Sequence, residues 1–370
     1  MQEITVLERA RSEFPPCAVR IVDGGYVVVG TYELDKASGA RHGSIEVYDK
    51  GLKLVGQTAT YGAVLDLKVS PFDKETLVSA HSTGNVMVWR MREGALAAVA
   101  NLQLFGCDCV VTSVNFSAQE PGLLVVTTAG GAVATVDVET GAPDVRYASA
   151  AKVYEKADLK EYDVQGKREV AADLSRGVRE FSRGHSVECW IGEFGALSPL
   201  ENVVFSGGDD CAVHAYDVRA GGLIWANSAV HGGGVVALRP STPSFRPHMP
   251  TALLTGSYDD RIRSLDLRMM GNALYPGDNV RPLAVSELDL GGGVWRFVES
   301  PSNALDAETN DLLVCCMYDG ARVVAVDGND FTVKNVLKEG HESMCYGADW
   351  CDQFAVTCSF YDKSLQLWKP

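Results

Sequence analysis

The chain has 370 residues, enough for two ordinary domains or for one large repeat architecture. Its 48 acidic and 33 basic side chains leave a net charge of −15, which argues against direct binding to nucleic acid or to anionic membranes and favours a cationic or basic partner. Hydrophobic residues make up 46% of the chain, yet no apolar run approaches the length of a membrane span, so we expect a globular protein without membrane association.

The N-terminus and the cysteines indicate a cytoplasmic protein. The opening MQEITVLERARSEF contains acidic residues and no apolar stretch of signal-peptide length. The ten cysteines follow no disulfide-like rhythm and include no CxxC pair, so we interpret them as reduced, mostly buried thiols. The seven histidines are scattered without an HxH or HExxH pair, so we expect neither a metal site nor a cofactor.

Short predicted strands recur along the chain. Seven segments share a polar turn, an alternating apolar run and usually a closing Asp; they end at Lys50, Met91, Thr140, Arg219, Arg268, Gly328 and Lys369. Alternation with period two is typical of a strand with one buried face. Most segments follow one another at about forty to fifty residues, the spacing of WD repeats. The sequence therefore predicts an all-β fold, a seven-bladed WD-repeat β-propeller, with residues 1–370 as one domain.

Three of the segments also carry the polar residues of WD repeats. In such repeats a His pairs with an Asp in a tight turn, and a Ser or Thr and an aromatic residue complete the hydrogen-bond network. The three sets are Gly184-His185 with Ser206, Asp210 and Tyr216; His231 with Asp259 and Asp266; and Gly340-His341 with Asp362 and Trp368. The other four segments are identified by alternation and spacing alone.

The last repeat ends after its third strand, because the run Ser364–Trp368 stops two residues before the C-terminus. A four-stranded blade needs one more strand. The segment EITVLE, Glu3–Glu8, alternates and has no partner of its own. We therefore expect it to pair beside Leu365–Trp368, which closes the ring and removes an open sheet edge.

Three stretches fall outside the repeat pattern. Residues 145–177 are charged and alanine-rich with weak alternation, which favours a partly helical surface insertion over an eighth blade. Pro240–Pro250 is proline-rich, which predicts an extended loop. Met269–Val285 is expected to lie between two blades.

A narrower resemblance lies in the C-terminal half. The segments GGDDCAVHAYDVR, LLTGSYDDRIRSLDLR, GGGVWRF and HESMCYGADWCDQFAVTCSFYDKSLQLW resemble the corresponding parts of the diphthine methylesterase family, also called diphthine methyltransferase. The pattern HxSxxYGxDW (His341 to Trp350) followed by CSFYD (Cys358 to Asp362) is the most specific part. The resemblance covers residues 184–370 well, is weak over 1–140 and is absent from 145–177.

The resemblance implies a carboxylic ester hydrolase. Its reaction would be hydrolysis of the methyl ester of methylated diphthine on translation elongation factor 2, which frees a carboxylate for the final amidation to diphthamide. The partner would then be elongation factor 2 as a protein substrate. The negative charge argues against direct nucleic acid binding, and a closed propeller has no need to oligomerise, so we expect a monomer. The alternative is a non-catalytic WD-repeat scaffold that binds a protein partner, because many propellers are binding platforms.

The loops of the last four blades contain residues that fit this substrate. A quaternary ammonium cannot donate hydrogen bonds and is best held by aromatic faces near acidic groups. We therefore expect a substrate cradle at the mouth of the central channel, formed by Tyr258, Asp259, Trp295, Tyr346 and Tyr361. The alternative for the tyrosines is packing against the neighbouring blade. Trp190, Trp350 and Trp368 are interpreted as core residues.

Ester hydrolysis also needs a base and donors for the developing oxyanion. The proposed base is a histidine, His341 ahead of His231, and the backbone N–H groups of Gly232–Gly234 and Gly291–Gly293 are candidate donors. Each has a structural alternative. The histidines occupy the repeat position that bonds to an Asp, and the glycine runs also fit tight turns between blades.

Overall fold

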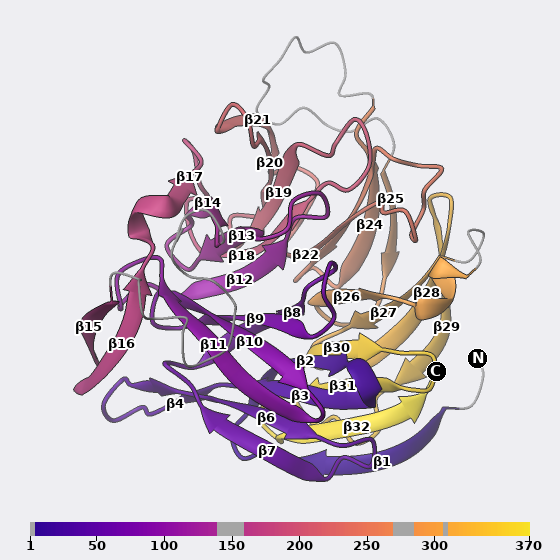
Figure 1. The fold of residues 1–370 in the computed structure, drawn as a ribbon. Coiled ribbons are helices and arrows are strands. Elements are labelled where there is room, and N and C mark those ends of the chain that lie inside the picture. Colours follow the sequence, from indigo (N-terminus) through magenta and orange to yellow (C-terminus); the bar gives the residue numbers. More distant parts are fainter. Residues whose placement is uncertain (1–3, 139–158, 269–284, 306–309) are drawn as a thin grey trace.

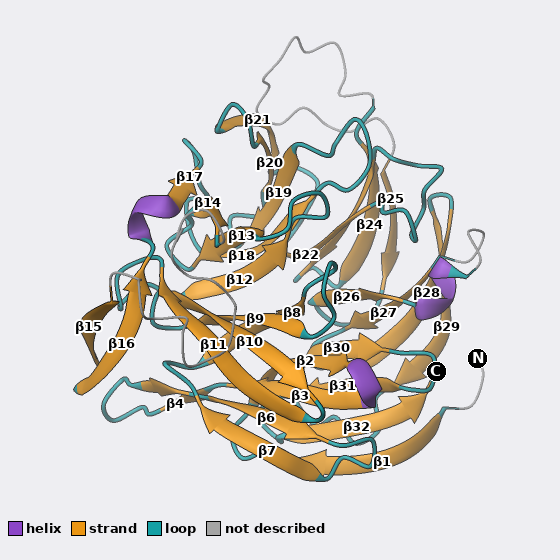
Figure 2. Cartoon of the chain, viewed as in Figure 1, coloured by secondary structure: helices purple, strands orange, loops and turns teal. Residues whose placement is uncertain are grey.

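The computed structural model describes residues 4–138, 159–268, 285–305 and 310–370. Strands dominate these residues, and the helical elements among them are three single turns of 3₁₀ helix: η1 (Asp23–Gly25), η2 (Ser175–Gly177) and η3 (Pro301–Ala304) (Figure 2). No helix in this part of the chain is long and apolar enough to cross a membrane.

The described strands form seven four-stranded antiparallel blades, which confirms the predicted propeller (Figure 1). Blade 1 is β2 (Pro16–Val22), β3 (Tyr26–Thr31), β6 (Ser44–Tyr48) and β7 (Leu54–Ala59), and blade 2 is β8 (Val64–Val69), β9 (Thr76–His81), β10 (Asn85–Arg92) and β11 (Ala95–Gln103). Blade 3 is β12 (Val111–Phe116), β13 (Leu123–Thr128), β14 (Val133–Asp137) and β17 (Val178–Glu180), and blade 4 is β18 (Cys189–Phe194), β19 (Val203–Gly208), β20 (Val213–Asp217) and β21 (Gly222–Asn227).

The remaining blades follow the same order. Blade 5 is β22 (Val235–Pro240), β23 (Ala252–Ser257), β24 (Arg261–Asp266) and β25 (Val285–Asp289), and blade 6 is β26 (Arg296–Glu299), β27 (Asp311–Cys315), β28 (Ala321–Asp327) and β29 (Asp330–Leu337). Blade 7 is β30 (Cys345–Trp350), β31 (Ala355–Ser359), β32 (Ser364–Lys369) and β1 (Thr5–Arg11). The first strand of each blade contacts the first strand of the next, and β30 contacts β2, so these inner strands form a closed ring.

The core lies between neighbouring blades. Val78 and Leu102 of blade 2, for example, share one apolar cluster with Val114 and Leu124 of blade 3. Both faces of a blade are therefore covered, which explains why second strands such as β13 (LLVVTT) read as nearly continuous apolar runs. Trp368 is fully buried, which confirms its predicted place in the core.

The N-terminal strand closes the ring as predicted. β1 pairs antiparallel with β32, with Val6 opposite Trp368 and Ala10 opposite Leu365. Figure 1 shows the indigo β1 running beside the yellow β32. The strand is longer than the predicted Glu3–Glu8 and ends at Arg11, and Glu3 lies outside the described residues.

The insertions differ from expectation. The described part of 145–177 forms a hairpin, β15 (Leu159–Val164) and β16 (Lys167–Asp173), and apart from the turn η2 it is not helical. β16 pairs in parallel with β11, so the open edge of blade 2 gains two more strands (Figure 1). Residues 145–158 lie outside the described residues.

The two other expectations are also corrected. Pro240–Pro250 is not extended: Thr242 bridges to Phe245, whose side chain is fully buried and packs with the core of blades 5 and 6. β24 and β25 pair within one blade, so the stretch from Met269 interrupts blade 5 instead of separating two blades. Its residues 269–284 lie outside the described residues.

Ring closure makes a prediction about the N-terminus. Deleting residues 1–11 removes β1 and leaves the N–H and C=O groups of β32 unpaired at a sheet edge. We expect a lower melting temperature and oligomers or aggregates in size-exclusion chromatography. Deletion of residues 1–3 alone, which precede β1, is the control and should change neither. An unchanged melting temperature after the longer deletion contradicts the role of β1 in closure.

Candidate functional site

A recurring bulge turns one side chain of each inner strand toward the channel. In six inner strands the antiparallel register skips one residue near the start of the strand: Cys17, Leu65, Thr112, Trp190, Val236 and Tyr346. A bulge bends the strand locally and re-aims its side chain. In blade 6 the corresponding place belongs to Trp295, which directly precedes β26. We call these seven residues the upper ring.

Six of the upper-ring residues, all except Val236, line a cavity of about 620 Å³ at this end of the channel. Its walls are rich in aromatic side chains, contributed by Tyr32, Trp190, Trp295, Tyr346, Phe360 and Tyr361. The charged side chains in its lining are Glu33, Lys36, Arg41, Glu188 and Arg296. The cavity therefore combines aromatic faces with two carboxylates and three cationic groups.

The aromatic side chains form one continuous wall. The ring centroid of Trp295 lies 4.7 Å from that of Tyr346 and 5.7 Å from that of Trp190. Tyr346 continues the wall to Phe360 at 5.2 Å, and Phe360 continues it to Tyr361 at 5.0 Å. Tyr361 is 67% exposed and Trp295 only 5%, so the wall runs from the solvent to the floor of the cavity.

Trp190 is held in this wall by a carboxylate. Its indole Nε1 donates a hydrogen bond to Asp209 Oδ1 at 2.7 Å. Burial raises the pKa of the Asp209 carboxyl, and this bond from Trp190 opposes the rise. The sequence interpretation of Trp190 as a core residue is therefore corrected, because the residue is only partly buried and lines the cavity.

Three of the five predicted cradle residues meet in the cavity: Trp295, Tyr346 and Tyr361. Tyr258 is not part of the lining but stacks on Trp295, with ring centroids 6.0 Å apart. Asp259 is engaged elsewhere, since its Oδ2 forms a 2.8 Å ion pair with Arg263 and accepts a 2.8 Å hydrogen bond from the Gly232 N–H. The structure does not bring Asp259 to the cavity.

The glycine runs serve close packing. A Cβ on Gly234 would lie 2.6 Å from Asp209 Oδ1, and one on Gly293 would lie 2.6 Å from Met317 Sδ. A Cβ on Gly292 would lie 2.3 Å from the carbonyl oxygen of Cys316. At these three positions the loops pass so close to neighbouring turns that a side chain would clash, which supports their interpretation as tight turns between blades.

Neither predicted base lines the cavity. His341 and His231 are 4% and 7% exposed, and each Nε2 shares a hydrogen bond with a threonine hydroxyl, Thr357 at 2.7 Å and Thr255 at 2.8 Å. Burial lowers the pKa of both histidines to about 4. The threonine bonds are those of the structural histidine of a WD repeat, but each Nδ1 has no hydrogen-bond partner among the described residues, so the predicted bonds to Asp362 and Asp259 do not form. The placement gives the catalytic assignment no support.

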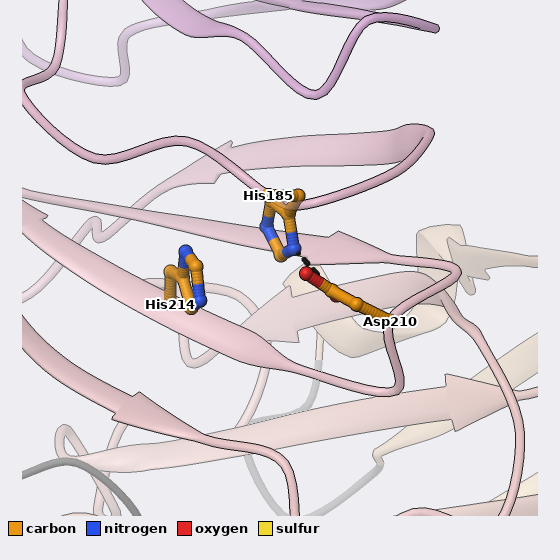
Figure 3. A group of neighbouring side chains, drawn as sticks. All are labelled: His185, Asp210 and His214. Carbon is orange, nitrogen blue, oxygen red and sulfur yellow. Dashed lines mark hydrogen bonds and ion pairs between the residues drawn. The ribbon is translucent and has the colours of Figure 1, made fainter.

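Among the described residues, three possible metal ligands of blade 4 lie close together: His185, Asp210 and His214 (Figure 3). His185 Nδ1 bonds to Asp210 Oδ1 at 2.8 Å and its Nε2 to Ser206 Oγ at 2.7 Å, so both ring nitrogens are engaged. The ring of His214 stacks on that of His185, with centroids 4.1 Å apart and planes 11° from parallel. Parallel stacked imidazoles cannot aim their lone pairs at one ion, so the cluster fits the predicted repeat network better than a metal.

The other end of the channel has a larger cavity, of about 720 Å³, with a different lining. Every inner strand contributes at least one residue to it, and we call one from each the lower ring: Arg20, Lys68, Asn115, Glu193, Arg239, Val298 and Asp349. The lower ring mixes both charges, and the aromatic residues of this lining are Phe297 and Trp350. The aromatic cavity is therefore the better candidate for a site that binds a cation.

Sequence reasoning missed part of the aromatic cavity. Trp190 could have been found, because it has the same place in its strand as Trp295 and Tyr346. Blade 1 gave no such signal. There the hairpin β4 (Glu33–Leu34) and β5 (Arg41–His42), in a long turn of a weakly patterned repeat, reaches the mouth and supplies Glu33 and Arg41.

Comparison with known proteins identifies relatives along the whole chain, although no family model matches. The chain is 46% identical over 384 aligned residues to diphthine methyltransferase of Saccharomyces cerevisiae, covering 100% of this chain and 99% of that protein. It is 31% identical to diphthine methyltransferase of Schizosaccharomyces pombe, covering 93% and 90%. The human protein of that name is 31% identical over 172 residues, covering 45% and 33%.

Among solved structures, a chain in the crystal structure of a mitotic checkpoint complex superposes with a TM-score of 0.66 over 99% of this chain and 92% of that chain. The two sequences are 13% identical, so this likeness supports the fold alone.

The buried histidines predict a pH-dependent stability. His81, His231 and His341 each have a pKa lowered to about 4 by burial, against about 6.5 when unfolded. Only the unfolded state takes up these protons between the two values, so the contribution of these three histidines to the free energy of unfolding should be complete above about pH 6.5 and fall as the pH drops toward 4. Urea denaturation across this range measures the slope.

His341→Gln isolates one contribution to that slope. The variant should be less stable at pH 7.5 by about 1–3 kcal/mol, because the buried Thr357 hydroxyl loses its partner. Its stability should also depend less steeply on pH. His42→Gln, on the partly exposed β5, is the control and should match the wild type. Equal slopes for His341→Gln and the wild type contradict the assignment of a neutral His341.

Proposed function

The chain belongs to the family whose curated members are named diphthine methyltransferase, and from this premise we propose that it hydrolyses the methyl ester of methylated diphthine on translation elongation factor 2. The family relationship makes it a methyl-modifying enzyme of diphthamide biosynthesis. Ester hydrolysis, elongation factor 2 as the substrate and a cytoplasmic location are the proposed refinements.

The observation that carries the proposal is the aromatic wall of Trp190, Trp295, Tyr346 and Tyr361 beside the Glu188 carboxylate. A trimethylammonium group has no N–H to donate, so aromatic faces and nearby negative charge are what can hold it. The wall is open to solvent at Tyr361 and closed at Trp295, which suits a modified side chain that projects from a protein.

The reaction needs few groups from the protein. Water adds to the ester carbon, the bond from that carbon to the methoxy oxygen breaks, and methanol leaves with one proton while a second proton goes to a base. The carboxylate remains on the substrate. Among the cavity-lining residues, Glu188 and Glu33 are the ones that can accept this proton as carboxylates. We assign the role to Glu188 because it lies beside Trp190 in the aromatic wall.

The non-catalytic scaffold remains the alternative hypothesis, and the activity assay decides between the two. The protein is incubated with elongation factor 2 that carries methylated diphthine, and the modified peptide is followed by mass spectrometry. We expect conversion of the methyl ester to the free carboxylate, with methanol released in equal amount. An intact ester, under conditions where a family member with known activity removes it, contradicts the proposal.

Two tyrosines in equivalent turns test the cradle. Tyr361 and Tyr318 both lie in a Tyr-Asp turn and are 67% and 62% exposed, but only Tyr361 lines the cavity. Tyr361→Ala should raise KM roughly twofold to thirtyfold, the cost of one cation–π contact of about 0.5–2 kcal/mol. Tyr318→Ala should leave KM unchanged. Equal effects of the two substitutions contradict the placement of the cation.

Glu188→Gln and His341→Gln test the base. Loss of the general base should lower kcat by about 10²–10⁴ in Glu188→Gln. His341→Gln should keep near-normal turnover per folded molecule, because His341 does not reach the cavity. Turnover and melting temperature are measured on the same samples. A stable His341→Gln protein with a hundredfold loss would instead restore the sequence-based assignment of His341.

A further inference from the structure

Arg296 lies on the floor of the aromatic cavity. It is the first residue of β26, directly after Trp295, and it is 9% exposed. Its guanidinium carbon lies 4.6 Å from the centroid of the Trp295 ring, so the cation stacks on the indole that forms the inner end of the aromatic wall. Arg296 is thus a buried positive charge inside a site proposed to bind a cation.

Its hydrogen bonds leave part of the guanidinium unused. Nη1 donates to the carbonyl oxygen of Trp295 at 2.9 Å and to that of Val236 at 2.8 Å. Within the described residues, Nη2 and Nε donate no hydrogen bond and no carboxylate forms an ion pair with Arg296. The charges of Asp66 and Glu193 act on Arg296 without a hydrogen bond to it, and Arg296 lines the cavity. An acceptor that enters the cavity can therefore bond to its free N–H groups.

Asp66, a carboxylate whose charge acts on Arg296, is already engaged by other groups. Asp66, which is 2% exposed, accepts hydrogen bonds from the backbone N–H groups of Leu67 at 2.9 Å and Val114 at 3.2 Å. Lys68 Nζ lies 3.5 Å from its Oδ2. The free N–H groups of Arg296 are therefore left for an acceptor that enters the cavity.

We propose that Arg296 binds the carbonyl oxygen of the substrate ester, stabilises the negative charge that develops on this oxygen when water adds, and then holds the product carboxylate. The identity of the substrate rests on the proposed function. Preorganised N–H donors aimed at a developing oxyanion favour the transition state over the ground state. A guanidinium is also the side chain that best matches the two oxygens of a carboxylate.

The same charge orients the substrate. The positive charge of Arg296 repels the trimethylammonium group, while the aromatic faces of Tyr346 and Tyr361 and the Glu188 carboxylate attract it. A ligand that carries both a quaternary ammonium and a carboxyl oxygen can satisfy both ends of the cavity at once. A ligand with the ammonium alone leaves Arg296 unpaired.

Arg20 supplies a matched control. Its Nη1 donates to the carbonyl oxygen of the preceding residue, Val19, at 2.7 Å and to that of Ala348 in the neighbouring blade at 3.1 Å, which is the bonding pattern of Arg296. Arg20 belongs to the lower ring and lines the other cavity. Substitution of either arginine removes two hydrogen bonds of the same kind, one to the preceding carbonyl and one to a carbonyl of the neighbouring blade. Only Arg296 lines the aromatic cavity.

The test uses two small probes that share the trimethylammonium group: betaine, which has a carboxylate, and choline, which has a hydroxyl. Calorimetric titration of the wild-type protein should show betaine binding about tenfold or more tightly, as expected for a hydrogen bond to a charged group. Arg296→Met should abolish this preference and leave choline binding nearly unchanged. Arg20→Met should keep the preference.

Turnover gives the second readout. Arg296→Met should lower kcat by about 10²–10³, the usual cost of losing one oxyanion donor, and Arg20→Met should stay near the wild-type value. Arg296→Lys keeps the charge without the planar pair of donors, so it should recover part of the betaine preference and part of the rate.

The outcomes separate this inference from the proposed function. Equal affinity of the wild type for betaine and choline, or a preference that survives in Arg296→Met, overturns the role of Arg296. Binding of neither probe overturns the aromatic site and both proposals with it. A betaine preference that depends on Arg296, in a protein that leaves the ester on elongation factor 2 intact, supports the carboxylate site and contradicts the hydrolase. If Arg296→Met does not fold, Arg296→Lys decides, because an unchanged betaine preference and rate in that variant overturn the role of the planar guanidinium.

Discussion

Pairing of β1 with β32 is the interaction on which the rest of the molecule depends, because the candidate site lies across the seam that this pairing closes. Tyr32 of blade 1 contacts Phe360 of blade 7 across this seam, with ring centroids 6.1 Å apart. Cys17 at the start of the chain and Tyr346 near its end line the same cavity. An open ring would separate Tyr32 and Cys17 of blade 1 from the aromatic wall, so ring closure contributes to stability and also assembles the cavity.

Below the aromatic wall the channel changes character. The cores between blades are apolar, whereas the channel-facing positions carry Arg296, Asp66 and the charged residues of the lower ring. Hydrogen bonds to the backbone of a neighbouring blade offset the cost of burying most of these charges, as between Arg296 and Val236 and between Asp349 and Ile21. The buried charges thereby link adjacent blades, and Arg296 retains N–H groups that can bind a ligand.

The sequence predicted the features that depend on local patterns and missed those that depend on register and on contacts between distant segments. Alternation and spacing were sufficient for the seven blades and for β1, and the motif around Tyr346 and Tyr361 pointed to two side chains that line the aromatic cavity. Trp190 was assigned to the core because alternation does not reveal a bulge. The charged, alanine-rich composition of 145–177 favours helix. The pairing of β16 with β11, more than fifty residues earlier in the chain, leaves no local pattern that would predict the hairpin β15–β16. The histidines share one local motif, and only their burial and their threonine partners favour structure over catalysis.

We propose that the aromatic cavity holds a quaternary ammonium at its wall and a carboxyl oxygen at its floor. A crystal structure of the protein soaked with betaine tests this claim most directly. We predict the trimethylammonium group against Tyr346 and Tyr361, with the carboxylate on Arg296. Betaine bound in the reverse orientation, or bound outside this cavity, would contradict it.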